Sequence, residues 1–189
     1  GHSYKGLCDM VGSYYYTYDE KNPIRFNPFY ISEGDTLDTE KKESIKTLLL
    51  ALWKKDNETF NRSEYVALSN ALQLYYEKLE ANPDLFPCFD TFYEFLKRDF
   101  VKLLEGDKVK EKDFDVNNFL YVLRPYYKGG EFDYLLNATE NLELLKERFI
   151  VFELDNIKDH PILFPVVTII IMEVFISKMR KLKGVRKMI

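Results

Sequence analysis

Cysteine, histidine and tryptophan are scarce in this sequence of 189 residues, which has two Cys, two His and one Trp. Cys8 and Cys88 lie far apart, so neither a CxxC pair nor a disulfide framework is present. We therefore expect free thiols and a reducing compartment. His2 and His160 stand alone, which excludes a recognisable zinc-binding motif.

The common signatures of catalysis are also missing. The sequence contains no GxxxxGK[ST], GxGxxG, HExxH or GxSxG motif. Its net charge is −4, from 31 acidic and 27 basic residues, so the basic excess typical of a nucleic-acid-binding domain is absent. The first ten residues lack the basic and apolar regions of a signal peptide. These absences argue against a complete catalytic site within the chain.

The most apolar stretch, Ile162 to Ile176, is too short to cross a membrane. It contains Pro165, Thr168 and Glu173, whereas a spanning helix needs about 20 consecutive apolar residues. We expect a helix buried inside the protein.

Aromatic residues are abundant, with 15 Phe and 14 Tyr in a chain that is 46% hydrophobic and 31% charged. This composition is typical of a globular protein and unlike that of a disordered segment. Each buried aromatic side chain removes roughly 150–250 Å² from water, so a sizeable core is expected.

Amphipathic helices are predicted in the middle of the chain. Asp38 is positioned to cap the first helix, and Asn61 with Glu64 has the spacing of a capping box for the second. Thr91 with Glu94 has the same spacing for a third, which ends at Gly106, and a fourth over 116–123 stops before Pro125. The apolar stripe of the first helix consists of Ile45, Leu48, Leu49, Leu52 and Trp53.

Strands are predicted on both sides of these helices. Tyr14–Tyr18 has strong β propensity, and the apolar run Phe149–Leu154 is typical of an inner strand of a parallel sheet. A helix from His160 to Lys183 is expected to stop at Gly184, and a further strand to begin near Arg186. Strand, helix and strand together form a βαβ unit.

The predicted fold is therefore mainly α with a few strands, in which a helical region is inserted into an α/β sheet. We predict a strand and loop piece over residues 1–35, an all-helical insertion over 36–146, and a strand–helix–strand segment over 147–189. The sequence starts in an apparent loop and stops as a strand begins, so we expect both ends to lie inside a longer protein.

Three groups of residues are candidate contact sites. Lys128, Gly129 and Gly130 form either a turn or a loop that a ligand approaches closely. Glu153 and Asp155 follow the second predicted strand, where they either cap the next helix or face a ligand at the sheet edge. The third group is basic and suits either a helix C-terminus with a solvated face or a phosphate or nucleic-acid contact; it comprises Lys178, Arg180, Lys181, Lys183, Arg186 and Lys187.

Five segments, in order along the chain, resemble the TraG-family conjugation ATPases, the VirB-type traffic ATPases of type IV secretion found on conjugative transposons. These segments are Gly1–Cys8, Phe26–Phe29, Leu123–Phe132, Arg148–Leu154 and Gly184–Ile189. The resemblance implies pieces of a RecA-like motor fold and a parent protein that uses ATP and Mg²⁺. It also implies a bacterial cytoplasmic location at the inner membrane, a homo-oligomeric parent and contacts with secretion-channel components.

The chain departs from the family pattern at both ends. It starts after the expected phosphate loop and stops before the expected acidic pair, so no nucleotide-binding, metal-binding or catalytic residue is assigned to it. ATP hydrolysis needs a phosphate cradle, a Lys and a carboxylate-held Mg²⁺, so we expect this piece to be inactive and to serve packing, subunit or channel contacts. Three alternatives stay open: a free-standing helical protein-interaction module, a DNA-contacting module that uses the basic tail, and an unrelated enzyme.

Overall fold

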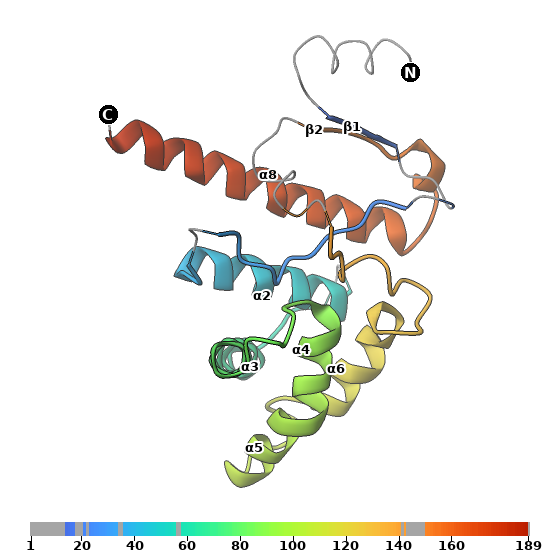
Figure 1. Ribbon diagram of the computed structural model, residues 1–189. Helices are drawn as coiled ribbons and strands as arrows, with labels where there is room; N and C mark the ends of the chain where they lie inside the picture. Colours follow the sequence, from blue (N-terminus) through green and yellow to red (C-terminus); the bar gives the residue numbers. More distant parts are fainter. Residues whose placement is uncertain are drawn as a thin grey trace. The chain divides into compact units, whose positions relative to one another are not determined.

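The computed structural model describes residues 14–17, 21, 23–33, 36–55, 58–140, 142 and 150–188 (Figure 1). The chain divides into two compact units. One, the helical unit, runs from Asn27 to Asn137, and the other, the strand unit, consists of the two flanking segments. The helical unit thus begins and ends earlier than the predicted insertion of 36–146. The domain roles assigned to these segments stay predictions.

The strand unit contains two short parallel strands. β1 (Tyr14–Thr17) pairs with β2 (Ile150–Glu153) in the register Tyr14↔Ile150 to Thr17↔Glu153. Phe26 packs against Phe152, with ring centroids 6.2 Å apart, and the backbone N–H of Ala138 donates to the carbonyl of Phe26 at 3.0 Å. The parallel direction predicted for the strand at 149–154 is confirmed for Ile150–Glu153, while Phe149 lies outside the described residues. In the sheet formed by the described residues β2 has one partner strand, so its predicted inner position stays a prediction.

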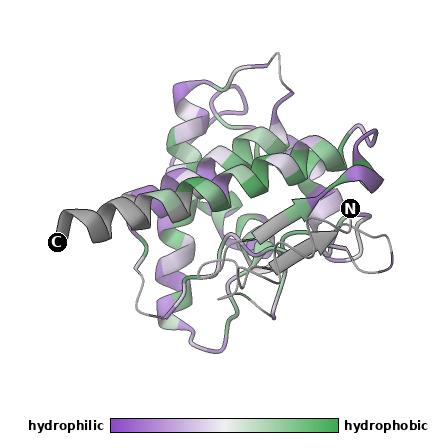
Figure 2. Cartoon of the chain, turned by 90° about the horizontal axis from the view of Figure 1, so that it is seen from above, coloured by the Kyte–Doolittle hydropathy of each residue, from purple (hydrophilic) through white to green (hydrophobic). Residues whose placement is uncertain are grey.

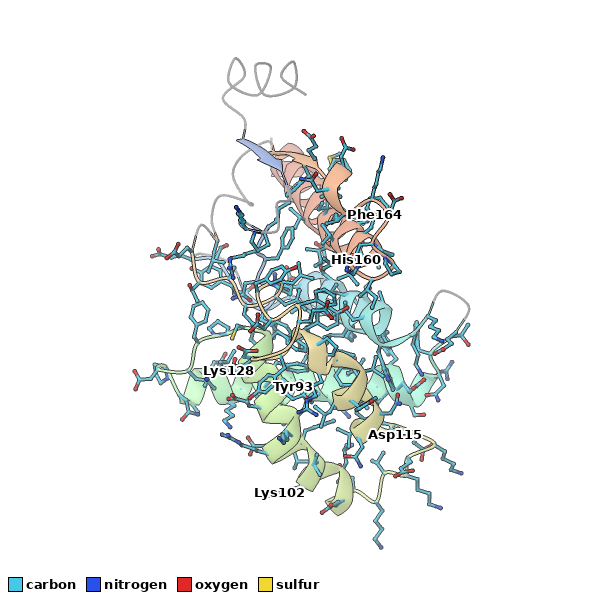
Figure 3. All side chains as sticks on the ribbon, turned by 90° about the vertical axis from the view of Figure 1, so that its right-hand side faces the viewer. Tyr93, Lys102, Asp115, Lys128, His160 and Phe164 are labelled. Carbon is cyan, nitrogen blue, oxygen red and sulfur yellow. The ribbon has the colours of Figure 1, made fainter. Side chains whose placement is uncertain are left out.

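The strand unit continues into a 3-10 turn, η3 (Asp155–Ile157), and the long helix α8 (Leu163–Met188). The imidazole Nδ1 of His160, labelled in Figure 3, accepts from the backbone N–H groups of Ile162 at 3.2 Å and Leu163 at 3.0 Å. This side chain therefore caps the start of α8, because two donors of the first helical turn find an acceptor there.

The helix α8 differs from the prediction at its end. It runs through Gly184 to Met188, so the expected stop at Gly184 and the strand expected from Arg186 are wrong. A glycine inside a helix costs only about 1 kcal/mol relative to Ala, and the Lys, Arg and Met around it favour helix.

The predicted burial of the stretch from Ile162 to Ile176 holds for one side of α8. Its buried positions are Leu163, Val166, Val167 and Ile170, and its exposed apolar positions include Phe164, Met172 and Phe175. Figure 2 shows apolar and polar residues interleaved along the described part of this helix. No helix among the described residues has the length and hydropathy needed to span a bilayer.

The helical unit contains the predicted helices. They are α2 (Thr39–Trp53), α3 (Arg62–Ala81), α4 (Phe89–Phe95), α5 (Val101–Gly106) and α6 (Val116–Leu123), followed by a 3-10 turn, η2 (Arg124–Tyr126). Between α4 and α5 lies a π turn, η1 (Leu96–Phe100), in which the N–H of Val101 donates to the carbonyl of Leu96. The third predicted helix therefore extends to Gly106 as expected, but with one wider turn in its middle.

Local capping explains where the first two helices begin. The Asp38 side chain accepts from the N–H of Lys41 at 2.8 Å, and Asn61 and Glu64 exchange both hydrogen bonds of a capping box. Phe60 stacks on Tyr65 at 6.3 Å, which gives α3 the hydrophobic staple that often precedes such a box. The predicted start of the third helix at Thr91 is wrong, because α4 begins at Phe89 with Cys88 as its N-cap.

Aromatic side chains form the core of the helical unit. Phe29 is fully buried and stacks on Phe92 at 5.1 Å, while Tyr75 meets Phe92 edge-on at 5.2 Å. Tyr76 is buried beside them and donates its hydroxyl to the carbonyl of Phe29 at 2.6 Å. Trp53 is 6% exposed, which confirms its predicted place on the buried stripe of α2.

Candidate interaction sites

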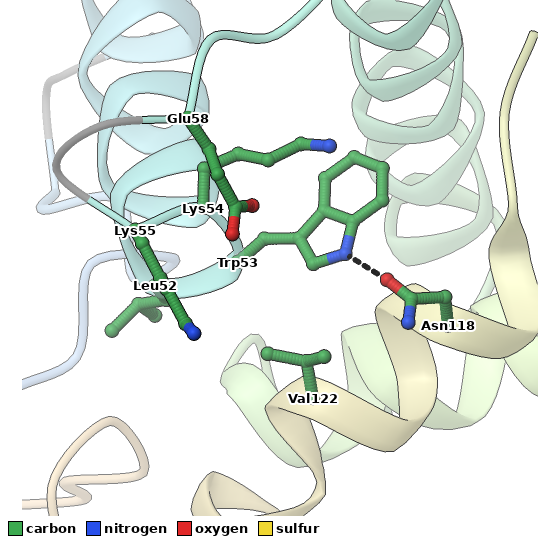
Figure 4. A pocket seen from close by; sticks show the side chains of 7 residues that line it. All are labelled: Leu52, Trp53, Lys54, Lys55, Glu58, Asn118 and Val122. Atoms are coloured by element: carbon green, nitrogen blue, oxygen red, sulfur yellow. Dashed lines mark hydrogen bonds between the residues drawn. The ribbon is translucent and has the colours of Figure 1, made fainter.

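A shallow pocket of about 290 Å³ opens between the end of α2 and α6 (Figure 4). The indole N–H of Trp53 points to α6 and donates to the Oδ1 of Asn118 at 2.8 Å. The ammonium of Lys54 lies 4.0 Å from the centroid of the Trp53 ring and 2.8 Å from a carboxylate oxygen of Glu64. The residues that line the pocket are Leu52, Trp53, Lys54, Lys55, Glu58, Asn118 and Val122.

The lining of this pocket combines apolar and charged side chains. Leu52, Trp53 and Val122 give it apolar walls, and the charged side chains of Lys55 and Glu58 lie at its rim. Its lining has no Ser, Thr, Cys or His side chain. Its volume is at the lower end of the range for small-molecule sites, about 300–1,000 Å³.

The predicted glycine loop is a tightly packed turn. Gly129 has a φ of +86°, and a Cβ added to Gly130 would lie 2.4 Å from the carbonyl oxygen of Pro125. Both positions therefore require glycine, one for its conformation and one for the close approach of the backbone.

The amides of this turn already have acceptors. The N–H of Lys128 donates to Asp90 at 2.9 Å, that of Gly129 to Asp133 at 3.1 Å, and that of Gly130 to the carbonyl of Tyr127 at 2.7 Å. A phosphate cradle needs backbone N–H groups that point at the ligand. The observed bonds therefore favour the turn interpretation of residues 128–130.

Burial raises the pKa values of two ionisable groups around this turn, Asp90 and Tyr127. Burial raises the pKa of the Asp90 carboxyl, and the nearby carboxylates of Glu94 and Asp133 add to the effect. Tyr93 and Tyr127 stack with ring centroids 4.3 Å apart. Tyr93 and Lys128, the residue after Tyr127, are labelled in Figure 3. Burial, together with a hydrogen bond to Glu94, raises the pKa of Tyr127 to about 12.

The remaining predicted residues lie in the strand unit. Lys181, Lys183, Arg186 and Lys187 all belong to the last turns of α8, where cations suit the negative end of the helix dipole. Their side chains are outside the described part of the structure. Glu153 is the last residue of β2, and Asp155 is the first of η3, whose N-terminus has no side-chain cap.

A buried lysine between α2 and α3 escaped the sequence analysis. Lys46 is 5% exposed, and its ammonium donates to Tyr65 at 2.9 Å and to Ser69 at 2.7 Å and pairs with Glu43 at 2.6 Å. Burial acts to lower the pKa of Lys46, but the hydrogen bonds that its ammonium donates to Glu43 and Tyr65 outweigh it, so the pKa is raised. The same contacts lower the pKa of Glu43. Because Glu43 and Lys46 belong to α2 and Tyr65 and Ser69 to α3, this network joins the two helices.

The sequence analysis also missed the pocket. Trp53 and Asn118 are 65 residues apart, and no local pattern brings them together. Cys88 is buried, and burial raises the pKa of its thiol, which makes it an unreactive core residue. No cluster of three or more His, Cys, Asp or Glu side chains suited to a metal ion occurs among the described residues.

The helices and strands described above define the fold class of the chain. The chain consists of an all-helical unit and a unit with two parallel strands and a long helix, so it is a mostly helical protein with a small α/β component. The model of the TraG P-loop domain family matches residues 1–189, and the chain belongs to this family.

A solved structure shares the fold. The structure of VirB4 of Thermoanaerobacter pseudethanolicus aligns with a TM-score of 0.53 at 17% sequence identity, over 91% of this chain. The chain spans 44% of the length of that VirB4 structure. No curated protein matches the sequence.

Proposed function

We propose that this chain is part of a conjugative-transfer ATPase of type IV secretion and that it contributes contacts to the motor instead of hydrolysing ATP. Membership of the TraG P-loop domain family and the VirB4-like fold support the parent assignment. The contact role is supported by one observation above all. The only adjacent glycines of the chain form a turn whose amides are bonded within the helical unit, so they offer no phosphate cradle.

The parent would supply the missing chemistry. ATP and Mg²⁺ would bind to a phosphate loop and an acidic pair located outside these 189 residues. The parent would act in the bacterial cytoplasm at the face of the inner membrane, as a homo-oligomer that contacts channel components. Sequencing the gene on both sides tests this directly: a GxxxxGK[ST] motif should precede Gly1, and an apolar run ending in two acids should follow Ile189. Flanking coding sequence that contains neither of these two motifs would contradict the proposal.

Calorimetry tests whether the chain itself holds a nucleotide-binding site. The purified chain should show no heat of binding when Mg²⁺–ATP is titrated at micromolar concentrations, whereas the parent protein, if it carries the phosphate loop, should bind under the same conditions. Micromolar binding by the chain alone, in a preparation free of contaminating ATPases, would show that it holds a nucleotide site.

A second candidate function is contact with DNA through the end of α8. The helix gathers six basic residues between Lys178 and Lys187 and has no acid after Glu173. Phosphate contacts would make binding weaken steeply with salt. Fluorescence anisotropy with a labelled oligonucleotide over a salt series tests this, and replacing Lys183 and Arg186 by Gln should reduce the salt slope. Binding that is absent at low salt removes this candidate.

A further inference from the structure

One side chain of α6 stands out of the surface beside the pocket. Tyr121 is 75% exposed, the largest exposed fraction among the described large apolar and aromatic residues. It adjoins Val122, which lines the pocket, and it follows Asn118 by three positions, a spacing that places two side chains next to each other on a helix. A projecting aromatic ring and an open pocket are therefore neighbours on one surface.

The pocket is large enough for such a ring. Its volume of about 290 Å³ corresponds to roughly ten water molecules at 30 Å³ each. Apolar contacts would come from Leu52, Trp53 and Val122, while a phenol hydroxyl would meet the amide of Asn118 at the rim. Tyrosine combines an apolar body with a polar tip, which is why it often anchors interfaces.

We infer that this surface binds a second copy of the same chain, with Tyr121 of each copy inserted into the pocket of the other. A two-fold interface places the same patch on both partners, so residue i contacts residue j and j contacts i. A projecting ring and a pocket on the same surface satisfy this condition. The inference deepens the contact role and rests on it.

The charges at the rim favour a second copy over a nucleic acid. The charged residues of the pocket lining are Lys54, Lys55 and Glu58, of which Lys54 pairs with Glu64. Arg124 follows Tyr121 by three positions. A rim with both signs can complement itself when it is rotated by half a turn, because the acid of one copy faces a base of the other. A phosphate backbone would require a surface of one sign.

The contact is small and therefore weak. Two tyrosines that each remove roughly 150–250 Å² from water form the centre of an interface below the standard size, and such interfaces are transient. We expect a weak dimer that forms only at high concentrations of the chain.

Trp53 reports on this pocket, because it is the single tryptophan of the chain and lines the cavity. Sedimentation equilibrium and tryptophan emission, measured from micromolar to near-millimolar chain, should show dimer formation with a parallel change in the spectrum. Tyr121→Ser should weaken the dimer by roughly tenfold or more, as expected of a central anchor, and Tyr121→Phe should retain it.

The matched control is Leu103→Ser, an exposed apolar residue of α5 that is 43% exposed and does not line the pocket. It should leave both signals unchanged. A chain that stays monomeric over the whole range, or a dimer that Tyr121→Ser leaves intact, overturns the inference. Neither result affects the ATPase assignment, which is tested by the flanking gene sequence and by nucleotide binding.

Discussion

Replacing Lys46 by Met tests whether the buried ionic network joins α2 to α3. Methionine keeps most of the aliphatic length but removes the charge and three polar contacts, to Glu43, Tyr65 and Ser69. A hydrogen bond that involves a charged group contributes a net of about 1.5–3 kcal/mol, with the exchange against water already included.

The expected loss is smaller than for a fully buried pair. Removing one partner of such a pair costs about 3–5 kcal/mol, because the other charge stays buried without compensation. The side chain of Glu43 is 41% exposed, so water can solvate it in the variant. We therefore expect Lys46→Met to lower the free energy of unfolding by about 1.5–3 kcal/mol, the net value of one charged hydrogen bond and below the cost of breaking a fully buried pair.

Urea unfolding followed by circular dichroism measures this loss. Lys42→Met is the matched control, since Lys42 is on the same helix and bonds to Gln73 at an exposed position. It should change stability by less than about 0.5 kcal/mol. The difference between wild type and Lys46→Met should shrink as the pH falls below 4.5, because the lowered pKa of Glu43 stabilises the fold only while the carboxyl is ionised. Equal losses in the two variants would refute the role of the network.

Three further predictions concern the core and the turns. Burial raises the pKa values of Tyr75 and Tyr76, so stability present below pH 10 should be lost above it, and tyrosinate absorbance should rise together with the loss of helical signal. Gly130→Ala should destabilise the chain by more than about 1 kcal/mol in thermal unfolding, whereas Gly106→Ala, with nothing within 4 Å of its Cβ, should be neutral or stabilising. Trp53→Ala should cost about 3–5 kcal/mol, and a loss under about 1 kcal/mol would contradict its burial.

Features fixed by neighbouring residues were predictable from the sequence. Asp38 and Asn61 cap their helices through bonds that span three positions, so the pattern alone locates both starts. The apolar stripe that ends at Trp53 likewise follows from helical periodicity. The resemblance to the family was carried by ordered segments and agreed with the family match over the whole chain.

Features that depend on distant residues were not predictable. The first N–H groups of α4 are satisfied from another part of the chain, since Phe89 donates to the carbonyl of Leu136 and Asp90 to the side chain of Asn137. This allows the helix to start at a weak cap, Cys88, three residues before the threonine that local rules favour. The pocket has the same origin, because Trp53 meets its partner on α6 across 65 positions.

The hydrogen bond between Phe26 and Ala138 bears on the order of folding. Tyr14 and Ile150 pair across 136 positions, which is a costly loop to close in an unfolded chain. The ends of the helical unit are held near the start of α4, Asn27 through Pro87 and Asn137 through Asp90. Once that unit has folded, the path along the chain from Tyr14 to Ile150 that passes through the Phe26–Ala138 bond is only about 24 positions long. The entropic cost of closing the loop between the two strands then falls by about 1.5 kcal/mol.

During synthesis, β1 leaves the ribosome long before β2 is made. At roughly 5–20 residues per second, β1 waits several seconds or more without its partner. An unpaired strand is open to wrong pairing during that time. The helical unit, which is complete by Asn137, can fold in this interval and bring the two halves of the sheet together as soon as the second half emerges.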